Sequence, residues 1–223
     1  MKGKLIVIDG TDGSGKATQT QLLVQKLQAE GYDVALADFP RYGERSATLV
    51  EDYLNGQFGS AQDVGPYRAS IFYACDRYAA SFQIKEWLAQ GKIVVSNRYV
   101  SASMGHQAGK IKHLDEVDTY LDWLQHLEYT IFGIPQPDAT ILLYMPVDIG
   151  QQLVDHKGHR DYVGGQTRDI HEADIHHLTD AASAYQYVAK KYHWPIIHCA
   201  PDGNLRSIEE IHQELWNLLK TLI

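Results

Sequence analysis

The sequence predicts an α/β fold in which helices cover both faces of a parallel β-sheet, and three observations lead to it. Five short runs of apolar and β-branched residues alternate with segments of helical periodicity. The first run passes directly into a glycine-rich turn of the kind that binds phosphate, and a helical pattern follows that turn. The chain has 223 residues, 44% hydrophobic and 22% charged, which suits a single globular domain over residues 1–223.

The predicted strands are Leu5–Ile8, Val34–Ala37, Ile93–Ser96, Thr140–Tyr144 and Ile196–Cys199. Between them, apolar residues recur at spacings of three and four, which predicts helices with core-facing stripes. Two such stripes are Val117, Leu121, Leu124 and Ile131, and Leu178, Ala181, Tyr185, Val188 and Tyr192. The last helix is predicted to begin at a capping box of Ser207 and Glu210. It is expected to bury Ile208, Ile211, Leu215, Leu218 and Leu222.

Composition argues against several classes of protein. The formal net charge of −8, from 20 basic and 28 acidic residues, has the wrong sign for a protein that coats nucleic acid or an anionic membrane. The two cysteines, Cys75 and Cys199, lack metal-ligand spacing and suit free thiols in the cytoplasm. No stretch approaches the roughly 18 apolar residues of a membrane span. We therefore expect a cytoplasmic protein with neither nucleic acid nor membrane as a partner.

The main chemical signal is the segment Gly10–Lys16, which has the P-loop pattern G-x-x-x-x-G-K between a strand and a helix. In that context backbone N–H groups and the positive end of the helix point at a phosphate, while Lys16 adds a point charge. The expected ATP-binding residues are Gly10, Thr11, Asp12, Gly13, Ser14, Gly15, Lys16, Ala17 and Thr18. Asp12 lies inside the loop, so it either accepts a sugar hydroxyl or stabilises the turn.

Magnesium binding is expected to rely on residues other than the usual hydroxyl. The position after Lys16 is Ala17, where a P-loop normally offers Ser or Thr to Mg²⁺, and Thr18 comes one position late. Mg²⁺ keeps several waters and takes one or two carboxylates together with phosphate oxygens. Asp9, at the end of the first strand, is the predicted metal-side carboxylate.

A second group of residues suits a nucleotide acceptor. The helix predicted over Tyr67–Gln90 has two faces: Ile71, Cys75, Tyr78 and Phe82, assigned to the core, and a face that begins with Tyr73 and Arg77. An aromatic plane beside a guanidinium suits a nucleobase, although such pairs are also common on surfaces. Phe39-Pro40-Arg41-Tyr42 follows the second strand, and Asn97-Arg98-Tyr99 follows the third. Ligands of open parallel sheets bind at that edge, so these pairs predict a site for a second phosphate and a base.

Together these segments resemble the thymidylate kinase family, nearly from end to end. The resemblance rests on Asp9-Gly10-Thr11-Asp12, Phe39-Pro40-Arg41-Tyr42-Gly43, Tyr73 to Arg77, Asn97-Arg98-Tyr99, Gln136-Pro137-Asp138 and Asp169 to Asp174. It implies a homodimeric enzyme that transfers the γ-phosphoryl of MgATP to dTMP, giving dTDP and ADP. It also implies a five-stranded parallel sheet in the order 2-3-1-4-5.

The resemblance further implies roles for single residues. Lys16 and the loop amides would hold the ATP phosphates, and Asp12 would bind the 3′-hydroxyl of dTMP. Arg98, with Arg41 or Tyr42, would grip the dTMP phosphate. Tyr73 would stack on thymine and Arg77 would bond its edge. The other acceptor-side positions are Phe39, Ser103 at a base contact, His106 where the family usually has an aromatic that excludes a 2′-hydroxyl, and Gln107.

The polar stretch His156–Asp169 is expected to form a mobile lid, at about residues 150–170. The resemblance implies a transition-state arginine, which some members of the family carry in the P-loop and others in the lid, and this chain resembles the second kind. The P-loop itself carries Gly13 and Ser14, and Arg160 and Arg168 are the preferred lid candidates over Lys157. A lid can position a cation on the migrating charge and exclude water. Asn97 replaces a carboxylate that in the family helps to position Mg²⁺ through water.

Three alternatives stay open. Ser103 and His106 allow a kinase for another nucleotide or nucleoside, and Ala17 with Asn97 allows a nucleotide-binding protein without turnover. The third alternative is a metal site formed by His156, His159, His171, His176 and His177. Adjacent histidines on a helix point apart, which disfavours the metal site.

Overall fold

The computed structural model describes residues 3–155 and 175–223. Its centre is a five-stranded sheet of β1 (Lys4–Gly10), β2 (Val34–Asp38), β3 (Ile93–Asn97), β4 (Ala139–Tyr144) and β5 (Ile196–His198). The strand order is β2-β3-β1-β4-β5, and each neighbouring pair is parallel. The predicted fold class, all five strands and the order 2-3-1-4-5 are therefore confirmed.

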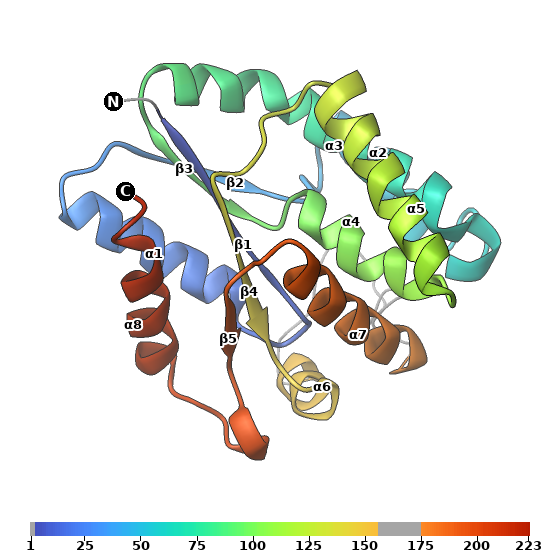
Figure 1. The fold of residues 1–223 in the computed structure, drawn as a ribbon. Helices are drawn as coiled ribbons and strands as arrows, with labels where there is room; N and C mark the ends of the chain where they lie inside the picture. Colours follow the sequence, from blue (N-terminus) through green and yellow to red (C-terminus); the bar gives the residue numbers. More distant parts are fainter. Residues whose placement is uncertain (1–2, 156–174) are drawn as a thin grey trace.

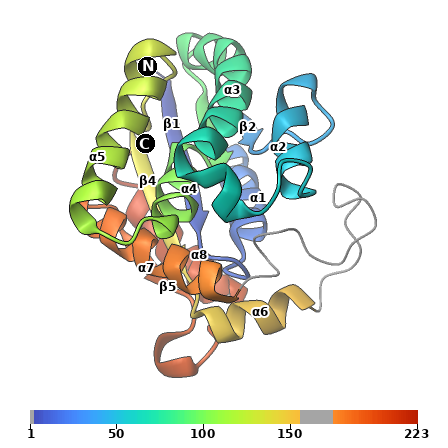
Figure 2. The same ribbon diagram turned by 90° about the vertical axis from the view of Figure 1, so that its right-hand side faces the viewer.

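Helices cover both faces of this sheet. They are α1 (Lys16–Ala29), α2 (Thr48–Leu54), α3 (Ala61–Ala89), α4 (Val100–His106), α5 (Leu114–Gln125), α6 (Val147–Asp155), α7 (Ile175–Lys191) and α8 (Ile208–Leu219). Figures 1 and 2 show α1 and α8 on one face, and α3, α4, α5 and α7 on the other. Within the described ranges, no helix is both long and apolar enough to cross a membrane.

The central strands are buried on both sides because each face of the sheet has its own core. Leu5 and Val7 of β1 pack with residues of α3, α4, α5 and α7. The alternate residues, Ile6 and Ile8, pack with α1 and α8. This period of two explains why β1 is a continuous apolar run in the sequence.

The core face of α3 differs from the prediction. Ile71, Tyr78 and Phe82 are 41%, 40% and 60% exposed, and Cys75 is only half-buried, so their assignment to the core is wrong. The helix instead turns Ala80 and Ile84 toward the sheet. A helix with two apolar stripes does not show from its own sequence which stripe meets the core.

The ends of α3 and α8 also differ in detail from the prediction. The helix α3 begins at Ala61, behind a capping box of Ser60 and Asp63, and departs from helical geometry at Gly65. The predicted capping box of α8 is confirmed: Ser207 Oγ accepts from Glu210 N.

The apolar stripes are confirmed along their middles and fail at their ends. The residues Leu178, Ala181, Tyr185 and Val188 of α7 are buried, as are Val117, Leu121 and Leu124 of α5 and Ile211 and Leu215 of α8. Tyr192 and Leu218 are half-buried, and the exceptions, Ile131, Ile208 and Leu222, are 63%, 50% and 42% exposed. Ile208 is the first residue of α8 and Leu222 lies three residues beyond its last residue, Leu219, so neither has a turn of helix on both sides to complete a packed stripe.

Candidate active site at the carboxyl edge of the sheet

A cavity of about 390 Å³ opens at the carboxyl ends of β1, β2 and β3. It brings together thirteen of the residues predicted from the sequence: Asp12, Gly13, Gly15, Lys16, Ala17, Phe39, Tyr42, Tyr73, Arg77, Arg98, Ser103, His106 and Gln107. They come from the P-loop, the segments after β2 and β3, α3 and α4. The predicted residues Asp9, Gly10, Thr11, Ser14, Thr18 and Arg41 do not line this cavity.

The P-loop has a conformation that requires glycine at two positions. Gly13 and Gly15 have φ angles of +76° and +81°, which side chains of other residues rarely allow, and α1 begins directly after Gly15. Lys16 Nζ donates to the carbonyl oxygens of Gly10 and Thr11 at 3.0 and 2.8 Å. The loop thus places its lysine and the start of α1 at the cavity, as phosphate binding requires.

The helix α6 packs directly against the backbone of the P-loop, across the carboxyl edge of the sheet (Figures 1 and 2). A Cβ atom on Gly13 would lie 2.4 Å from the carbonyl oxygen of Gly150, and a Cβ on Gly150 would lie 2.3 Å from that of Asp12. Two backbones therefore meet without side chains between them. A side chain at either glycine would push the P-loop and α6 apart.

Arg98 lies at the centre of the site and joins the P-loop to α4. Its Nη2 donates to Asp12 Oδ1 at 2.9 Å, and its Nη1 lies 3.1 Å from His106 Nε2. The backbone of Arg98 has a φ of +64°, an unfavourable left-handed conformation for arginine. Such strain is typically retained where it positions a functional side chain.

The charges around Arg98 fix the protonation of its neighbours. Burial acts to raise the pKa of Asp12, but Arg98 and Lys16 outweigh it and hold that pKa well below its usual range. Burial lowers the pKa of His106 well below its ordinary value of 6.5, so the ring is neutral near pH 7. A guanidinium only donates, so His106 Nε2 is the acceptor and Nδ1 carries the proton.

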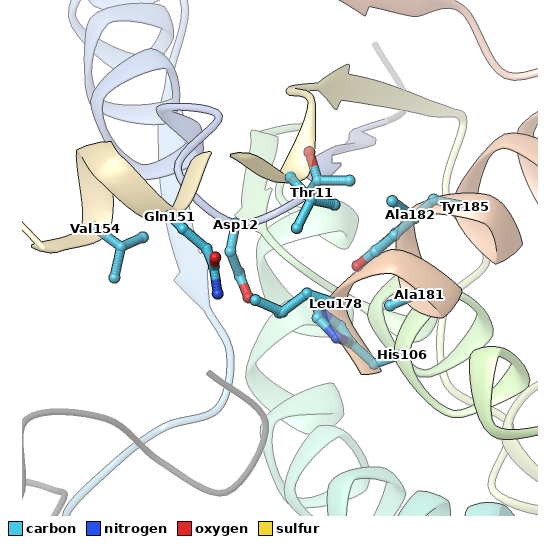
Figure 3. A pocket seen from close by; sticks show the side chains of 10 residues that line it. Thr11, Asp12, His106, Gln151, Val154, Leu178, Ala181, Ala182 and Tyr185 are labelled. Atoms are coloured by element: carbon cyan, nitrogen blue, oxygen red, sulfur yellow. The ribbon is translucent and has the colours of Figure 1, made fainter. Parts of the chain in front are cut away.

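Asp12 and His106 also face a narrow crevice between α6 and α7. Figure 3 shows Gln151 and Val154 of α6 on one side of it and Leu178 and Tyr185 of α7 on the other. The lining is mostly apolar apart from Asp12, His106 and Gln151.

Asp9 is completely buried behind the P-loop. Its Oδ1 accepts from Gly10 N at 2.8 Å and from Tyr185 Oη at 2.9 Å, and its Oδ2 accepts from Ser101 Oγ at 2.5 Å. A carboxylate has about four acceptor positions, so Oδ2 retains one. Asp9 therefore anchors β1 to α4 and α7, and its part in metal binding stays a prediction.

Asn97 and Asp38 form a pair that the sequence analysis did not identify. Asn97 Nδ2 donates to Asp38 Oδ1 at 2.8 Å, and both residues line the cavity. Asn97 Oδ1 is buried and has no partner among the described residues. Burial raises the pKa of Asp38. The pair joins the ends of β2 and β3, which are neighbours in space but 59 residues apart in the chain.

Phe39, Tyr73, Arg77, Ser103 and Gln107 also line the cavity, and we call them the base-side wall after the base contacts predicted from the sequence. Arg77 is 2% exposed, and its Nε and Nη2 donate to the two carboxylate oxygens of Glu128 at 2.7 and 2.6 Å. The Nη2 atom also donates to Ser103 Oγ at 2.9 Å. Glu128 could not be predicted from the sequence, because no local pattern links it to an arginine 51 residues earlier.

Arg41 is directed away from the cavity. Its Nε donates to Asp76 Oδ1 at 3.0 Å and its Nη2 donates to Ser46 Oγ at 2.7 Å, while its backbone N donates to Asp76 Oδ2 at 2.9 Å. In this structure Arg41 holds the segment after β2 against α3, and Tyr42 is the residue of the predicted pair that faces the cavity. Of the two expected alternatives, Arg41 or Tyr42, Tyr42 therefore lines the cavity and Arg41 does not.

Some predicted residues lie outside the described ranges. These are Arg160 and Arg168, together with Lys157 and most of the expected lid at 150–170. Of the histidine cluster, only His176 and His177 are described, and His177 stacks on His106 with ring centroids 5.9 Å apart. Residues 3–155 and 175–223 contain no group of three metal-ligating side chains.

The cavity is lined by a P-loop and by arginine, aromatic and amide side chains. Such a site defines a P-loop kinase that acts on a nucleotide. The family model described as Thymidylate kinase matches residues 8–215, and the chain belongs to this family.

Individual relatives agree with this assignment. The chain is 28% identical over 186 residues to "Thymidylate kinase" of Mycobacterium tuberculosis, covering 83% of this chain and 85% of the relative. It is 26% identical over 219 residues to "Thymidylate kinase" of Homo sapiens, covering 96% and 88%. A solved structure of thymidylate kinase from Candida albicans has the same fold, with a TM-score of 0.74, 22% identity, and coverage of 99% of this chain and 92% of that one.

Proposed function

We propose that the chain transfers the γ-phosphoryl group of MgATP to dTMP, giving dTDP and ADP. The observation that carries the proposal is Arg98, which contacts the P-loop residue Asp12 and lies in the same cavity as the base-side residues Tyr73 and Arg77. The cavity is lined by the P-loop, by Arg98 and by the base-side wall, so a donor phosphate and an acceptor phosphate can be aligned in it. Phosphoryl transfer needs such alignment and charge stabilisation more than it needs covalent chemistry.

The donor side is the P-loop. In the proposed mechanism, the amides before α1 bind the β- and γ-phosphates, and Lys16 exchanges its loop carbonyls for phosphate oxygens. Ala17 and Thr18 extend this site along the first turn of α1. Because the amides are fixed by Gly13 and Gly15, they need no reorganisation as charge moves between the phosphates.

The acceptor side is built around Arg98. Its guanidinium, together with Tyr42, holds the dTMP phosphate in line with the γ-phosphoryl group. Asp12 stays ionised beside Arg98 and Lys16 and accepts the 3′-hydroxyl, while Tyr73 stacks on the base. His106, beside the crevice between α6 and α7, flanks the sugar. Phe39, Ser103 and Gln107 complete the base-side wall.

The residues present fit a hydrated Mg²⁺ ion. Asn97 lines the cavity, and its Oδ1 is buried without a partner among the described residues, so it can hold metal-bound water. Asp9 does not line the cavity, but its Oδ2 retains one acceptor position, so it would take part only through a water that reaches it behind the P-loop. Asp38 orients Asn97 by accepting from its amide. The ion, when bound, would neutralise charge on the transferring phosphates. We place the transition-state cation on Arg160 or Arg168, because the P-loop has Gly13 and Ser14 instead of an arginine.

We also propose a homodimer in the cytoplasm. The exposed stripe of Ile71, Tyr78 and Phe82 lies at spacings of seven and four on α3, and a second copy of the chain would bury it. Two free cysteines suit a reducing compartment. Sedimentation of the wild type and Phe82→Asp tests the dimer: we expect the wild type at twice the chain mass and the variant as a monomer. A monomeric wild type would contradict it.

The catalytic proposal is tested by ADP release with MgATP and a panel of dTMP, dUMP, dCMP, dAMP, dGMP and UMP. We expect the highest kcat/KM on dTMP, and its loss in Arg98→Ala. Arg68→Ala is the matched control, because Arg68 is an exposed arginine of α3 outside the cavity. A preference for another monophosphate would identify a different nucleotide kinase. ATP binding without turnover on any acceptor would indicate a nucleotide-binding protein instead.

A further inference from the structure

Arg77 has almost all of its hydrogen-bonding capacity occupied by the protein. A guanidinium has five N–H donors. Two donate to Glu128, one to Ser103 Oγ and one to the carbonyl oxygen of Tyr99 at 3.2 Å. The one left is the second hydrogen on Nη1, for which the described residues provide no partner. Because Arg77 lines the cavity, this hydrogen is the one available to a ligand.

Glu128 is placed for this contact by an unusual backbone. It lies in a π-helical turn, His126–Ile131, that continues α5, and its side chain is completely buried. Such turns are rare and frequently occur at functional sites. Both carboxylate oxygens of Glu128 bond the guanidinium, which fixes its plane as well as its position.

Stability alone is a weak reason for this ion pair. Removing two charges from water costs about as much free energy as their attraction provides. Apolar residues of similar size therefore often stabilise a core equally well. A fixed guanidinium plane, however, is what a binding site needs to distinguish two ligands of similar shape. The burial of Glu128 behind a cavity residue therefore favours a role in recognition.

We propose that Glu128 is a positioning residue that holds Arg77 so that its remaining Nη1 hydrogen selects a nucleobase with a carbonyl oxygen at the pairing edge over one with an amino group. The proposal rests on the proposed function, and it adds the residue that sets base selection. An amino group would place a donor against a donor in a closed pocket, and that loss is large where the partner is buried. Glu128 accepts from both Nε and Nη2 of Arg77. The guanidinium therefore cannot rotate toward Ser103, although Ser103 also accepts from Nη2.

The test measures binding of dTMP and of 5-methyl-dCMP by calorimetry, followed by kcat and KM for dTMP. The two ligands differ at position 4 of the base, which carries a carbonyl or an amino group, and in the proton on N3, which only dTMP carries. Glu128→Gln keeps the shape but sets an amide N–H against one guanidinium N–H. Glu128→Asp keeps the charge and serves as the conservative rescue. Leu124→Ala, a buried residue of α5 outside the cavity, is the control for a loss of stability.

We expect Glu128→Gln to weaken dTMP binding by about tenfold or more, the effect of one hydrogen bond to a charged group. The preference for dTMP over 5-methyl-dCMP should fall by a similar factor, KM should rise more than kcat falls, and Glu128→Asp should recover part of both. Leu124→Ala should lower Tm and leave the preference unchanged.

Three results with the variants would overturn the proposal. The first is a folded Glu128→Gln with an unchanged preference for dTMP over 5-methyl-dCMP, and the second is an equal loss of that preference in Leu124→Ala. The third, where Glu128→Gln does not fold, is an unchanged preference in Glu128→Asp. Wild-type protein that binds dTMP without turnover would reject the kinase and still allow this comparison. Wild-type protein that binds neither ligand would reject both proposals.

Discussion

Gly150→Ala tests whether α6 holds the P-loop in place. In an exposed helix interior, replacing glycine by alanine stabilises a protein by about 1 kcal/mol. Here the new Cβ would lie 2.3 Å from the carbonyl oxygen of Asp12, where ordinary contact begins at 3.4 Å. The atom in the way is backbone, so the two segments must separate by about 1 Å, and overpacking of this kind costs about 1–3 kcal/mol.

The helix propensity of alanine stabilises the variant and the close contact destabilises it, and the effect of the contact is the larger. We expect a net loss of about 1 kcal/mol, which lowers Tm by about 2–4 °C in a chain of this size. The larger effect should be on catalysis, because the carbonyl that moves belongs to Asp12, next to the carboxylate that bonds Arg98. A displacement of about 1 Å in a catalytic group can reduce the rate about 10²-fold.

The assay combines thermal unfolding with kcat/KM for dTMP and ATP. Gln152→Ala is the matched control, because Gln152 is an exposed residue of the same helix and its replacement adds helix propensity without a new contact. The control should keep both Tm and kcat/KM. A Gly150→Ala protein that is more stable than the wild type and fully active would refute the argument, because α6 would then tolerate a side chain against the P-loop.

Three further predictions follow from the charges. Arg98→Lys should lower kcat/KM by about 10²-fold or more, because one ammonium cannot reproduce a fixed guanidinium at Asp12 and His106; activity near wild type would contradict this. The pKa of Asp12 is lowered in the folded state, so its stabilisation exists above the ordinary value of 3.8 and disappears as pH falls below it. Asp12→Asn should therefore lower Tm near neutral pH, and the difference should close in acid; a constant difference would contradict this. Burial lowers the pKa of Lys110 from 10.5 to about 7, so the unfolded chain binds more protons between these values and stability should rise with pH there. Denaturant unfolding should show this rise in the wild type and not in Lys110→Met, and equal slopes would contradict it.

The sheet could be predicted because its signals are local. Each strand is a short apolar run, and the P-loop pattern marks the end of β1 and the start of α1 within seven residues, Gly10 to Lys16. The order of the strands depended on resemblance to a family, since alternation alone allows several topologies. For α3, two apolar stripes have similar composition, and only the packed structure shows that Ala80 and Ile84 meet the core.

The site could be predicted where residues follow a strand or share a helix face, as Arg98, Tyr73 and Arg77 do. It could not be predicted where one side chain determines the direction of another across the fold. Arg41 or Tyr42 was expected at the substrate phosphate, and Arg41 instead pairs with Asp76 of α3. Glu128 carries no signal of its own, because a single glutamate on a helix usually faces solvent.

The π-helical turn that carries Glu128 makes its contact with Arg77 depend on the number of residues in the segment. Over the same rise, such a turn contains one residue more than an α-helix would. If Leu127 were deleted and the segment became a regular continuation of α5, the carboxylate would rotate by about 100° around the helix axis and leave Arg77. A chain one residue shorter at this point would therefore lose the partner of Arg77 even if it kept the glutamate.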